Sequence, residues 1–195
     1  MTEELFRDDA TLTQCEARVI ALSEGGLVLD RTVFYPLGGG QAGDTGVLRL
    51  ADGRELIVTD TRKSREHPGG VLHVLAPDAL VAVGDAVTAQ IDVDRRSAHR
   101  RFHTTTHLLC ALVPHPVDGC SITAAYARLD FHMNEPLDKQ LLSEGIARLV
   151  PQARLVKLPA CGHSPHRDQP AALTRAVVSF LRRHGGAPAA KEVPT

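Results

Sequence analysis

The sequence is poor in several features that mark specialised classes of protein. It has no tryptophan, aromatic residues make up 4% of it, and its four cysteines are Cys15, Cys110, Cys120 and Cys161. The cysteines are not closely paired along the chain, which argues against a disulfide framework and favours a reducing compartment, the cytoplasm. No apolar run approaches the ~20 residues of a membrane-spanning helix. The acidic N-terminus lacks the apolar core of a signal peptide.

An excess of charge of one sign is also missing. The net charge is −1 over 195 residues, so the chain as a whole is not a polycation that nucleic acid would attract. Contact with RNA would therefore require a local basic patch. The segment "DRRSAHRRFH" supplies four arginines, among them Arg100, although this pattern is equally typical of a solvated helix face.

The pattern of apolar and turn residues along the chain changes near residue 94. Before it, short runs rich in β-branched residues alternate with turn residues, which predicts an antiparallel barrel or sandwich. The predicted strands are residues 15–22, 26–30, 32–36, 46–50, 55–60, 70–75 and 86–92.

Beyond residue 94 the apolar period lengthens to nearly four, which predicts helices. Asp94 is expected to cap a helix over residues 95–113, which ends before Pro114. One or two strands are predicted within residues 121–133, and a second helix after Pro136. A strand and loop, a last helix over residues 170–184 and a disordered tail complete the prediction.

The predicted helix carries two histidines, His103 and His107, in the stretch "RFHTTTHLLCAL". Four residues are slightly more than one helical turn, so the two rings share a face. Neutral imidazoles at this spacing can supply half of a tetrahedral zinc site. The same spacing also arises by chance on polar helix faces. His99, one turn earlier, is a possible third ligand, although one helix cannot easily bend three imidazoles around one ion.

A glycine-rich stretch, "TVFYPLGGGQAGDTG", lies between two of the predicted strands. Gly38, Gly39 and Gly40 permit positive φ and leave backbone N–H groups open to a ligand oxygen, while Gln41 offers an amide. From spacing alone a plain hairpin connection is the simpler interpretation.

Taken together, these stretches have a family likeness. The order "LDRTVFYPLGGGQAGDTG", "GDAVTAQIDVDRR", "FHTTTHLLCAL" and "GCSITAAYARLDF" resembles the AlaX family, free-standing relatives of the editing domain of alanyl-tRNA synthetase. The resemblance runs from about residue 4 to residue 139. It implies an α+β fold, in which an N-terminal antiparallel β-barrel resembling a translation-factor domain precedes an α+β editing domain.

The resemblance also implies an activity and a set of site residues. Family members cleave the ester of mischarged tRNA for alanine that carries serine or glycine, so tRNA would be the partner and zinc the cofactor. The zinc-binding pair maps to His103 and His107, and Gly39, Gly40 and Gln41 map to the motif that faces the editing site. Thr104, in the family's "HT" dipeptide, and Gln41 are the candidate catalytic residues. Arg100 is a candidate for substrate binding.

The C-terminal part departs from the family pattern. The family closes its zinc site with C-x-x-x-H, whereas this chain has "LPACGHSPHRDQP", in which Cys161 and His166 are separated by four residues. Cys161, together with either His166 or His163, is a candidate for a replacement pair of ligands. Residues 145–185 instead resemble the end of an α/β-hydrolase, with His163 at the position of the catalytic histidine. No G-x-S-x-G nucleophile motif precedes it, which speaks against that class.

The predicted organisation has four parts: a β-barrel over residues 1–93, an incomplete editing-domain segment over 94–142, a hydrolase-like tail over 143–185 and a disordered end over 186–195. The leading hypothesis is a trans-editing hydrolase with a zinc-bound site. The alternative is a catalytically inactive protein that binds tRNA, motivated by the missing C-x-x-x-H.

Overall fold

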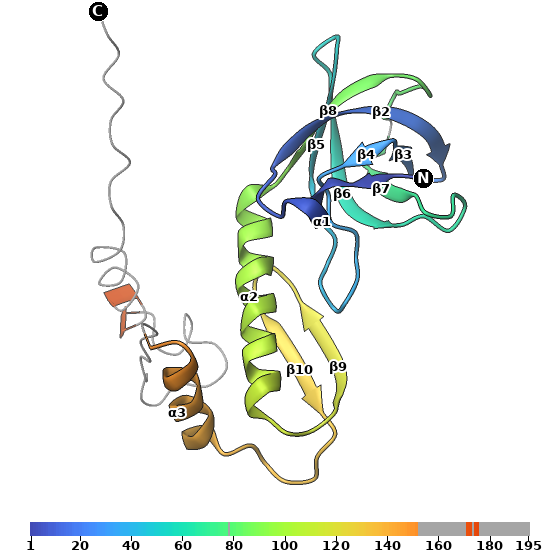
Figure 1. Ribbon diagram of the computed structural model, residues 1–195. Helices are drawn as coiled ribbons and strands as arrows, with labels where there is room; N and C mark the ends of the chain where they lie inside the picture. Colours follow the sequence, from blue (N-terminus) through green and yellow to red (C-terminus); the bar gives the residue numbers. More distant parts are fainter. Residues whose placement is uncertain (78, 152–170, 173, 176–195) are drawn as a thin grey trace, which may run out of the picture. The chain divides into compact units, whose positions relative to one another are not determined.

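A computed structural model of the chain describes residues 1–77, 79–151, 171–172 and 174–175 (Figure 1). The chain divides into two compact units, Met1–Leu142 and Ser143–Thr195. The described strands are β1 (Glu3–Glu4), β2 (Gln14–Ser23), β3 (Gly26–Leu29), β4 (Arg31–Thr32), β5 (Gly46–Leu50), β6 (Glu55–Lys63), β7 (Val71–Leu75), β8 (Ala86–Ile91), β9 (Val117–Ile122) and β10 (Ala127–Phe131). The helices are α1 (Leu5–Asp8), α2 (Val93–Leu112) and α3 (Lys139–Leu149). Among the described helices, none combines the length and the apolar character that a membrane span requires.

Six strands close into an antiparallel barrel in the order β2-β3-β7-β6-β5-β8. Buried and more exposed positions alternate along several of them, as in β8, because successive side chains of a strand point to opposite faces. The predicted α+β fold with an N-terminal antiparallel barrel is confirmed (Figure 1).

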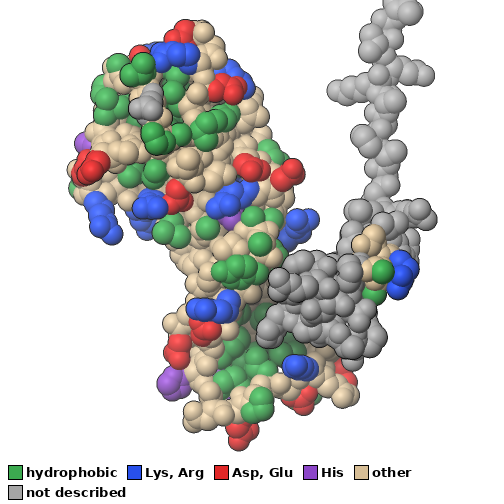
Figure 2. All heavy atoms as spheres, turned by 180° about the vertical axis from the view of Figure 1, so that it is seen from behind, with side chains coloured by type: hydrophobic (Ala, Val, Ile, Leu, Met, Phe, Trp, Pro, Cys, Tyr) green, Lys and Arg blue, Asp and Glu red, His purple; other side chains and the backbone are tan. Residues whose placement is uncertain are grey.

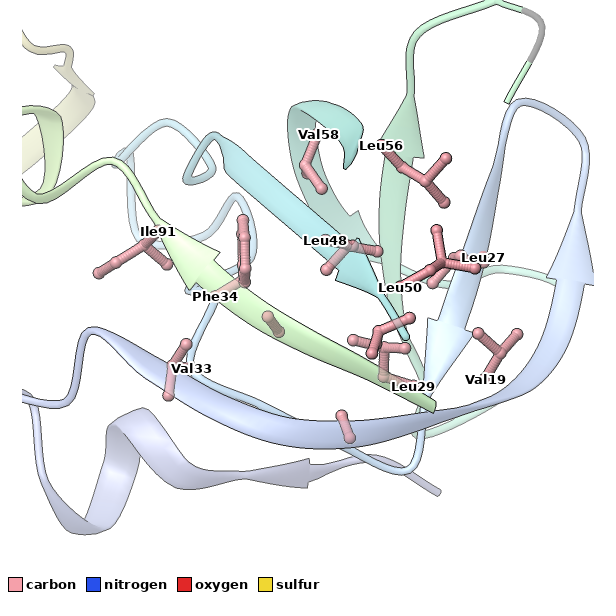
Figure 3. Packing of buried hydrophobic residues seen from close by; sticks show 13 residues of the cluster. Val19, Leu27, Leu29, Val33, Phe34, Leu48, Leu50, Leu56, Val58 and Ile91 are labelled. Atoms are coloured by element: carbon pink, nitrogen blue, oxygen red, sulfur yellow. The ribbon is translucent and has the colours of Figure 1, made fainter. Parts of the chain in front are cut away.

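The barrel interior holds the main hydrophobic core of the described chain. Ten of its residues, drawn from five of the barrel strands and from the segment after β4, point toward one another in Figure 3. They are Val19, Leu27, Leu29, Val33, Phe34, Leu48, Leu50, Leu56, Val58 and Ile91. All ten are buried, and burial of apolar surface on this scale is the main stabilising term of a small domain.

One predicted strand is much shorter than expected. Residues 32–36 were predicted to be extended, but only Thr32 belongs to a strand, the two-residue β4, which pairs in parallel with β1. The backbone N–H of Phe34 donates to the Thr32 hydroxyl, and that of Tyr35 donates to the Asp44 carboxylate. Side chains thus take the hydrogen bonds that a neighbouring strand would otherwise provide.

After the barrel, α2 packs against the hairpin of β9 and β10. The helix was predicted within two residues, but the prediction that Asp94 caps it is wrong. Asp92 is the N-cap, and its carboxylate accepts a hydrogen bond from the N–H of Arg95 at 3.0 Å. Asp94 lies in the first turn, where an acidic side chain is also favourable, so the sequence offered two acidic residues for one cap.

The remaining elements follow the sequence pattern with small shifts. The predicted strands within residues 121–133 form the β9–β10 hairpin, but β9 begins earlier, at Val117, and includes Cys120. Helix α3 is the helix predicted after Pro136. The strand, the helix over residues 170–184 and the tail predicted beyond residue 151 lie outside the described residues, apart from four positions.

Candidate functional site

The two histidines of the H-x-x-x-H pattern lie side by side on α2. The ring centroids of His103 and His107 are 5.0 Å apart, and their planes differ by 15°. His103 is half-buried, whereas His107 is exposed. The regular helix therefore brings the pair together as its spacing predicts.

The glycine-rich stretch forms a tight turn beside this pair. The backbone groups of Gly38 and Gln41 exchange two hydrogen bonds, of 3.0 and 3.1 Å, and the two residues between them have positive φ, 58° at Gly39 and 77° at Gly40. Such a turn favours glycine at both positions. The turn buries Gln41, of which 4% is exposed, and directs its side chain toward α2.

A hydrogen bond joins the glycine loop to the histidine pair. The distance from Gln41 Oε1 to His103 Nδ1 is 2.8 Å. An amide oxygen can only accept, so Nδ1 carries the proton of the neutral ring and Nε2 keeps its lone pair. The prediction that Gln41 lies near His103 is confirmed, and this contact between residues 62 positions apart defines the candidate site.

The loop is also fixed to the hairpin on its other side. The N–H of Ile122 donates to the Gly40 carbonyl at 2.8 Å, and the N–H of Ala42 donates to the Ile122 carbonyl at 2.9 Å. A Cβ atom at Gly40 would lie 2.8 Å from the Cys120 Sγ and 2.7 Å from the Cys120 carbonyl oxygen. Only glycine fits this close approach, which holds the loop between α2 and β9.

The ring of His103 meets the requirements of a zinc ligand. Burial, with a smaller contribution from the neighbouring His107, lowers the pKa of His103, which favours the neutral form that metals bind. Its Nδ1 is engaged by Gln41, the kind of outer contact that fixes the orientation of a ligating histidine. Among the described residues, two imidazoles could coordinate a zinc ion, and both would lie on the same side of it.

The other predicted ligands are not brought to the pair within the described part of the chain. Cys161 and His166 lie outside the described residues. His99 is fully buried, and no group of three His, Cys, Asp or Glu side chains among the described residues could hold a metal ion. Neither ring nitrogen of His99 has a hydrogen-bond partner there, and burial lowers its pKa.

The remaining predicted residues lie on α2 and in the loop. Thr104 follows His103 and is exposed, and Arg100 is exposed one turn before it. Arg100 shares a cavity of about 330 Å³ with Gln41, so these two predicted residues meet, whereas Thr104 does not line that cavity. Gly39 is exposed and Gly40 is half-buried.

Sequence reasoning missed the ion pair that attaches α2 to the barrel. The Arg96 guanidinium bonds the Asp44 carboxylate, with its Nε 2.9 and 3.1 Å from the two oxygens, and its Nη2 donates to the Val33 carbonyl at 2.7 Å. The Asp44 side chain is fully buried and that of Arg96 is 6% exposed. The only signal was an aspartate after the glycine motif and an arginine in the basic segment, 52 residues apart.

Comparison with known proteins places these features in a family. Residues 5–95 match the family described as tRNA synthetases class II (A). The chain is 34% identical to the alanyl-tRNA editing protein AlaX-M of Saccharolobus solfataricus over 68% of its own length and 57% of the relative's. For AlaX-M of Methanosarcina mazei the identity is 37%, over 74% of the chain and 60% of the relative.

A longer relative shares the same part of the chain. The alanine–tRNA ligase of Methanothrix thermoacetophila is 44% identical over 55% of this chain and 11% of the ligase. The chain thus spans less than two thirds of each of these relatives. With its closed barrel and the histidine helix beside a glycine loop, the chain is similar to the AlaX family of alanyl-tRNA editing domains.

Proposed function

We propose that this protein is a trans-editing hydrolase that deacylates mischarged tRNA for alanine, carrying serine or glycine, in the cytoplasm. The observation that carries the proposal is the contact of 2.8 Å between Gln41 Oε1 and His103 Nδ1, because it unites the family's glycine motif with its histidine pair. The relatives named above are alanyl-tRNA editing proteins and alanine–tRNA ligases, which supports tRNA as the partner.

The residues of the chain would divide the work as follows. Gln41 holds the His103 ring, and the exposed Thr104 hydroxyl on the following residue would orient the aminoacyl group. Gly39 and Gly40 would bring the backbone close to the substrate, and Arg100 would contact the RNA. An aminoacyl ester is already activated, so positioning and stabilisation of the oxyanion supply most of the rate enhancement.

Zinc would be held by His103 and His107. A bound zinc ion acts as a Lewis acid on an ester carbonyl or as an anchor for the substrate. The tail residues Cys161 and His166 are the proposed sources of further ligands, because thiolate and imidazole are the donors that zinc prefers. Water would complete the site if they do not bind.

The test is deacylation of seryl-tRNA for alanine by the full chain, with and without added zinc, together with the zinc content of the purified protein. We expect release of serine from the wild type and a joint loss of zinc and activity in His103→Ala and His107→Ala. His115→Ala is the matched control, since this exposed histidine lies outside α2. Unchanged zinc content in His103→Ala would show that the H-x-x-x-H spacing is accidental.

The same assay decides the role of the tail and the alternative function. If Cys161→Ser or His166→Gln lowers zinc content as strongly as His103→Ala, the tail supplies ligands. Binding of tRNA without any deacylation, even with zinc present, would identify an inactive tRNA-binding protein. The described residues by themselves bring only two metal-binding side chains together at this site, which keeps that alternative open to test.

A further inference from the structure

The end of the barrel that carries the connection from β7 to β8 exposes a group of apolar side chains. They are Leu22, Ile57, Leu80 and Val83, and we call this group the apolar end. Leu80 and Val83 belong to the connection itself and are 75% and 60% exposed. Figure 2 shows hydrophobic side chains gathered on the barrel surface, with charged side chains around them. A large apolar surface with a polar rim marks a site of association.

Two hollows on the barrel surface join these side chains. The first hollow, of about 370 Å³, is lined by Leu22 of β2, and the second, of about 390 Å³, by Ile57 of β6 and by Leu80. Both hollows are also lined by Pro77 and Ala79 of the connection. The apolar end is therefore a continuous surface, on which the connection forms a ridge between two hollows.

Arginines hold this ridge in place from two sides. The Arg54 guanidinium, just before β6, donates to the Leu80 carbonyl at 2.7 Å. The Arg18 guanidinium, on β2, donates to the Gly84 carbonyl at 3.0 Å. The backbone of the ridge is thus fixed while its apolar side chains face solvent. A surface that is already ordered loses less conformational entropy when a partner binds.

The charged side chains around the apolar end are of both signs. Arg54 and Glu55 line the second hollow. Glu24 lies between two residues that line the first hollow, and Arg18 contacts Gly84. A nucleic acid requires an excess of positive charge, and the described rim has no such excess. Mixed charge instead suits a surface that meets a copy of itself, because basic groups of one copy can face acidic groups of the other.

The shape of the apolar end also favours a second copy of this chain as its occupant. A two-fold interface brings the same patch of both subunits together, so the patch has to be complementary to itself. A patch that carries both projecting side chains and a hollow can meet this requirement. The apolar end carries both, since the exposed Leu80 lies beside the two hollows.

We propose that the apolar end is a dimer interface, at which two copies of this chain associate about a two-fold axis with Leu80 of each copy in a hollow of the other. The dimer would cover the four exposed apolar side chains, and the burial of their surface would drive association. Dimer formation is independent of the editing activity, because no residue of the candidate site belongs to the apolar end.

Sedimentation velocity of the full chain at roughly 1 to 100 µM tests the dimer. We expect the wild type to be dimeric within this range, because interfaces of standard size have micromolar or lower dissociation constants. Leu80→Glu should raise the dissociation constant at least about 30-fold, the effect of losing an interface hot spot. Leu141→Glu is the matched control, because Leu141 of α3 is 66% exposed and lines neither hollow. It should dimerise as the wild type does.

A mixture of two charge variants tests whether the apolar end faces its own copy. Leu80→Glu and Leu80→Lys should each associate weakly, because a charge in one copy meets the same charge in the other. Their equimolar mixture should associate at least about tenfold more tightly than either variant alone, since opposite charges then meet. Circular dichroism melting identifies a variant that fails to fold, and Val83→Glu, at the second most exposed position of the apolar end, then replaces it.

Four results would overturn the dimer interface. The first is a wild type that stays monomeric over the whole concentration range, which would leave a different protein or another segment of the chain as the occupant. The second and third are unchanged association of Leu80→Glu and equal weakening in Leu141→Glu. The fourth is a mixture of the two charge variants that associates no more tightly than either variant alone.

Discussion

The barrel and the helix–hairpin segment that follows it bury their side chains in very different ways. The barrel encloses a cluster of thirteen buried apolar residues. Of the buried residues in α2, three are polar (Arg96, His99 and Thr106), and the hairpin strands contribute only Ile122. Figure 2 shows hydrophobic atoms at the surface of the lower lobe, and Val117 and Tyr126 of this region are 41% and 55% exposed.

This difference indicates that the barrel supplies most of the stability, whereas function depends on the junction between the barrel and the second region. The barrel holds itself together through apolar burial, whereas α2 and the hairpin depend on a few polar contacts with it. Those contacts include the Arg96–Asp44 ion pair and the hydrogen bonds of the glycine loop with His103 and Ile122. The candidate site lies at this junction, so changes there should affect the second region more than the first.

The largest effect is expected from breaking the buried ion pair. Arg96→Met leaves the Asp44 carboxylate buried without its partner and should lower the free energy of unfolding by about 3–5 kcal/mol. Urea denaturation followed by circular dichroism measures the change.

The neighbouring Arg95→Met serves as the control, because Arg95 is half-buried and, among the described residues, its side chain donates only to the Gly43 carbonyl, at 3.3–3.4 Å. It should cost less than about 1 kcal/mol. The double variant Asp44→Asn/Arg96→Met should recover part of the loss, since no buried charge remains. A loss in Arg96→Met no larger than in Arg95→Met would contradict the role of the pair.

A change of pH acts on the barrel through His73. Burial lowers the pKa of His73 from 6.5 to about 4, and its Nε2 lies 2.8 Å from the Thr32 hydroxyl. Between these two values the unfolded chain binds more protons than the folded one. Stability is therefore complete above pH 6.5 and falls as the pH drops toward 4, by up to about 3 kcal/mol.

The measurement is the difference in unfolding free energy between the wild type and His73→Gln across this pH range. The glutamine can still hydrogen-bond to Thr32 but cannot titrate, so its curve should lack this fall. Parallel curves for the two proteins would show that His73 does not titrate in an unusual way.

Gly40 tests how closely the loop must approach the hairpin. Gly40→Ala combines a positive φ of 77° with a Cβ atom 2.7 Å from the Cys120 carbonyl oxygen, and it should cost about 2–3 kcal/mol. Gly53→Ala is the control, because Gly53 has a similar φ of 87° and nothing within 4 Å of the added Cβ. It should cost about 1 kcal/mol. Equal losses of unfolding free energy in the two variants would mean that the hairpin can move away from the added Cβ atom without loss of stability.

Much of the fold follows from local sequence pattern. Strand alternation and glycine turns predicted the barrel strands, and the apolar period predicted α2 and α3, because each depends on residues close together in the chain. The strand expected over residues 32–36 failed in part for a nonlocal reason: the Asp44 carboxylate, nine residues along the chain from Tyr35, accepts the hydrogen bond of the Tyr35 N–H. The N-terminal segments β1 and α1 were also missed, since they are too short for a periodic pattern.

The candidate site was predictable only in part. The four-residue spacing on a helix predicted that His103 and His107 lie side by side, and the resemblance to the AlaX family predicted that Gln41 belongs to the site. No local pattern could reveal that Phe6 and Tyr35 meet at one cavity with Arg100, because they come from three separate segments. Cys161 and His166 remain predicted ligands, since they lie outside the described residues.

The smallest predicted effect concerns the residue at which the barrel passes into α2. Asp92→Ala removes the carboxylate that accepts from the Arg95 N–H and should lower the free energy of unfolding by about 1 kcal/mol. Asp94→Ala removes only a favourable charge in the first turn, which is worth a few tenths of a kcal/mol to about 1 kcal/mol and is screened by salt. Urea denaturation at 0.5 M salt and at a roughly tenfold lower salt concentration distinguishes the effects of the two variants. The loss in Asp92→Ala should persist at high salt, because it is a lost hydrogen bond, while that in Asp94→Ala should shrink. If Asp94→Ala costs more than Asp92→Ala at both salt concentrations, the cap belongs to Asp94, as the sequence alone suggests, and α2 begins later than the structure shows.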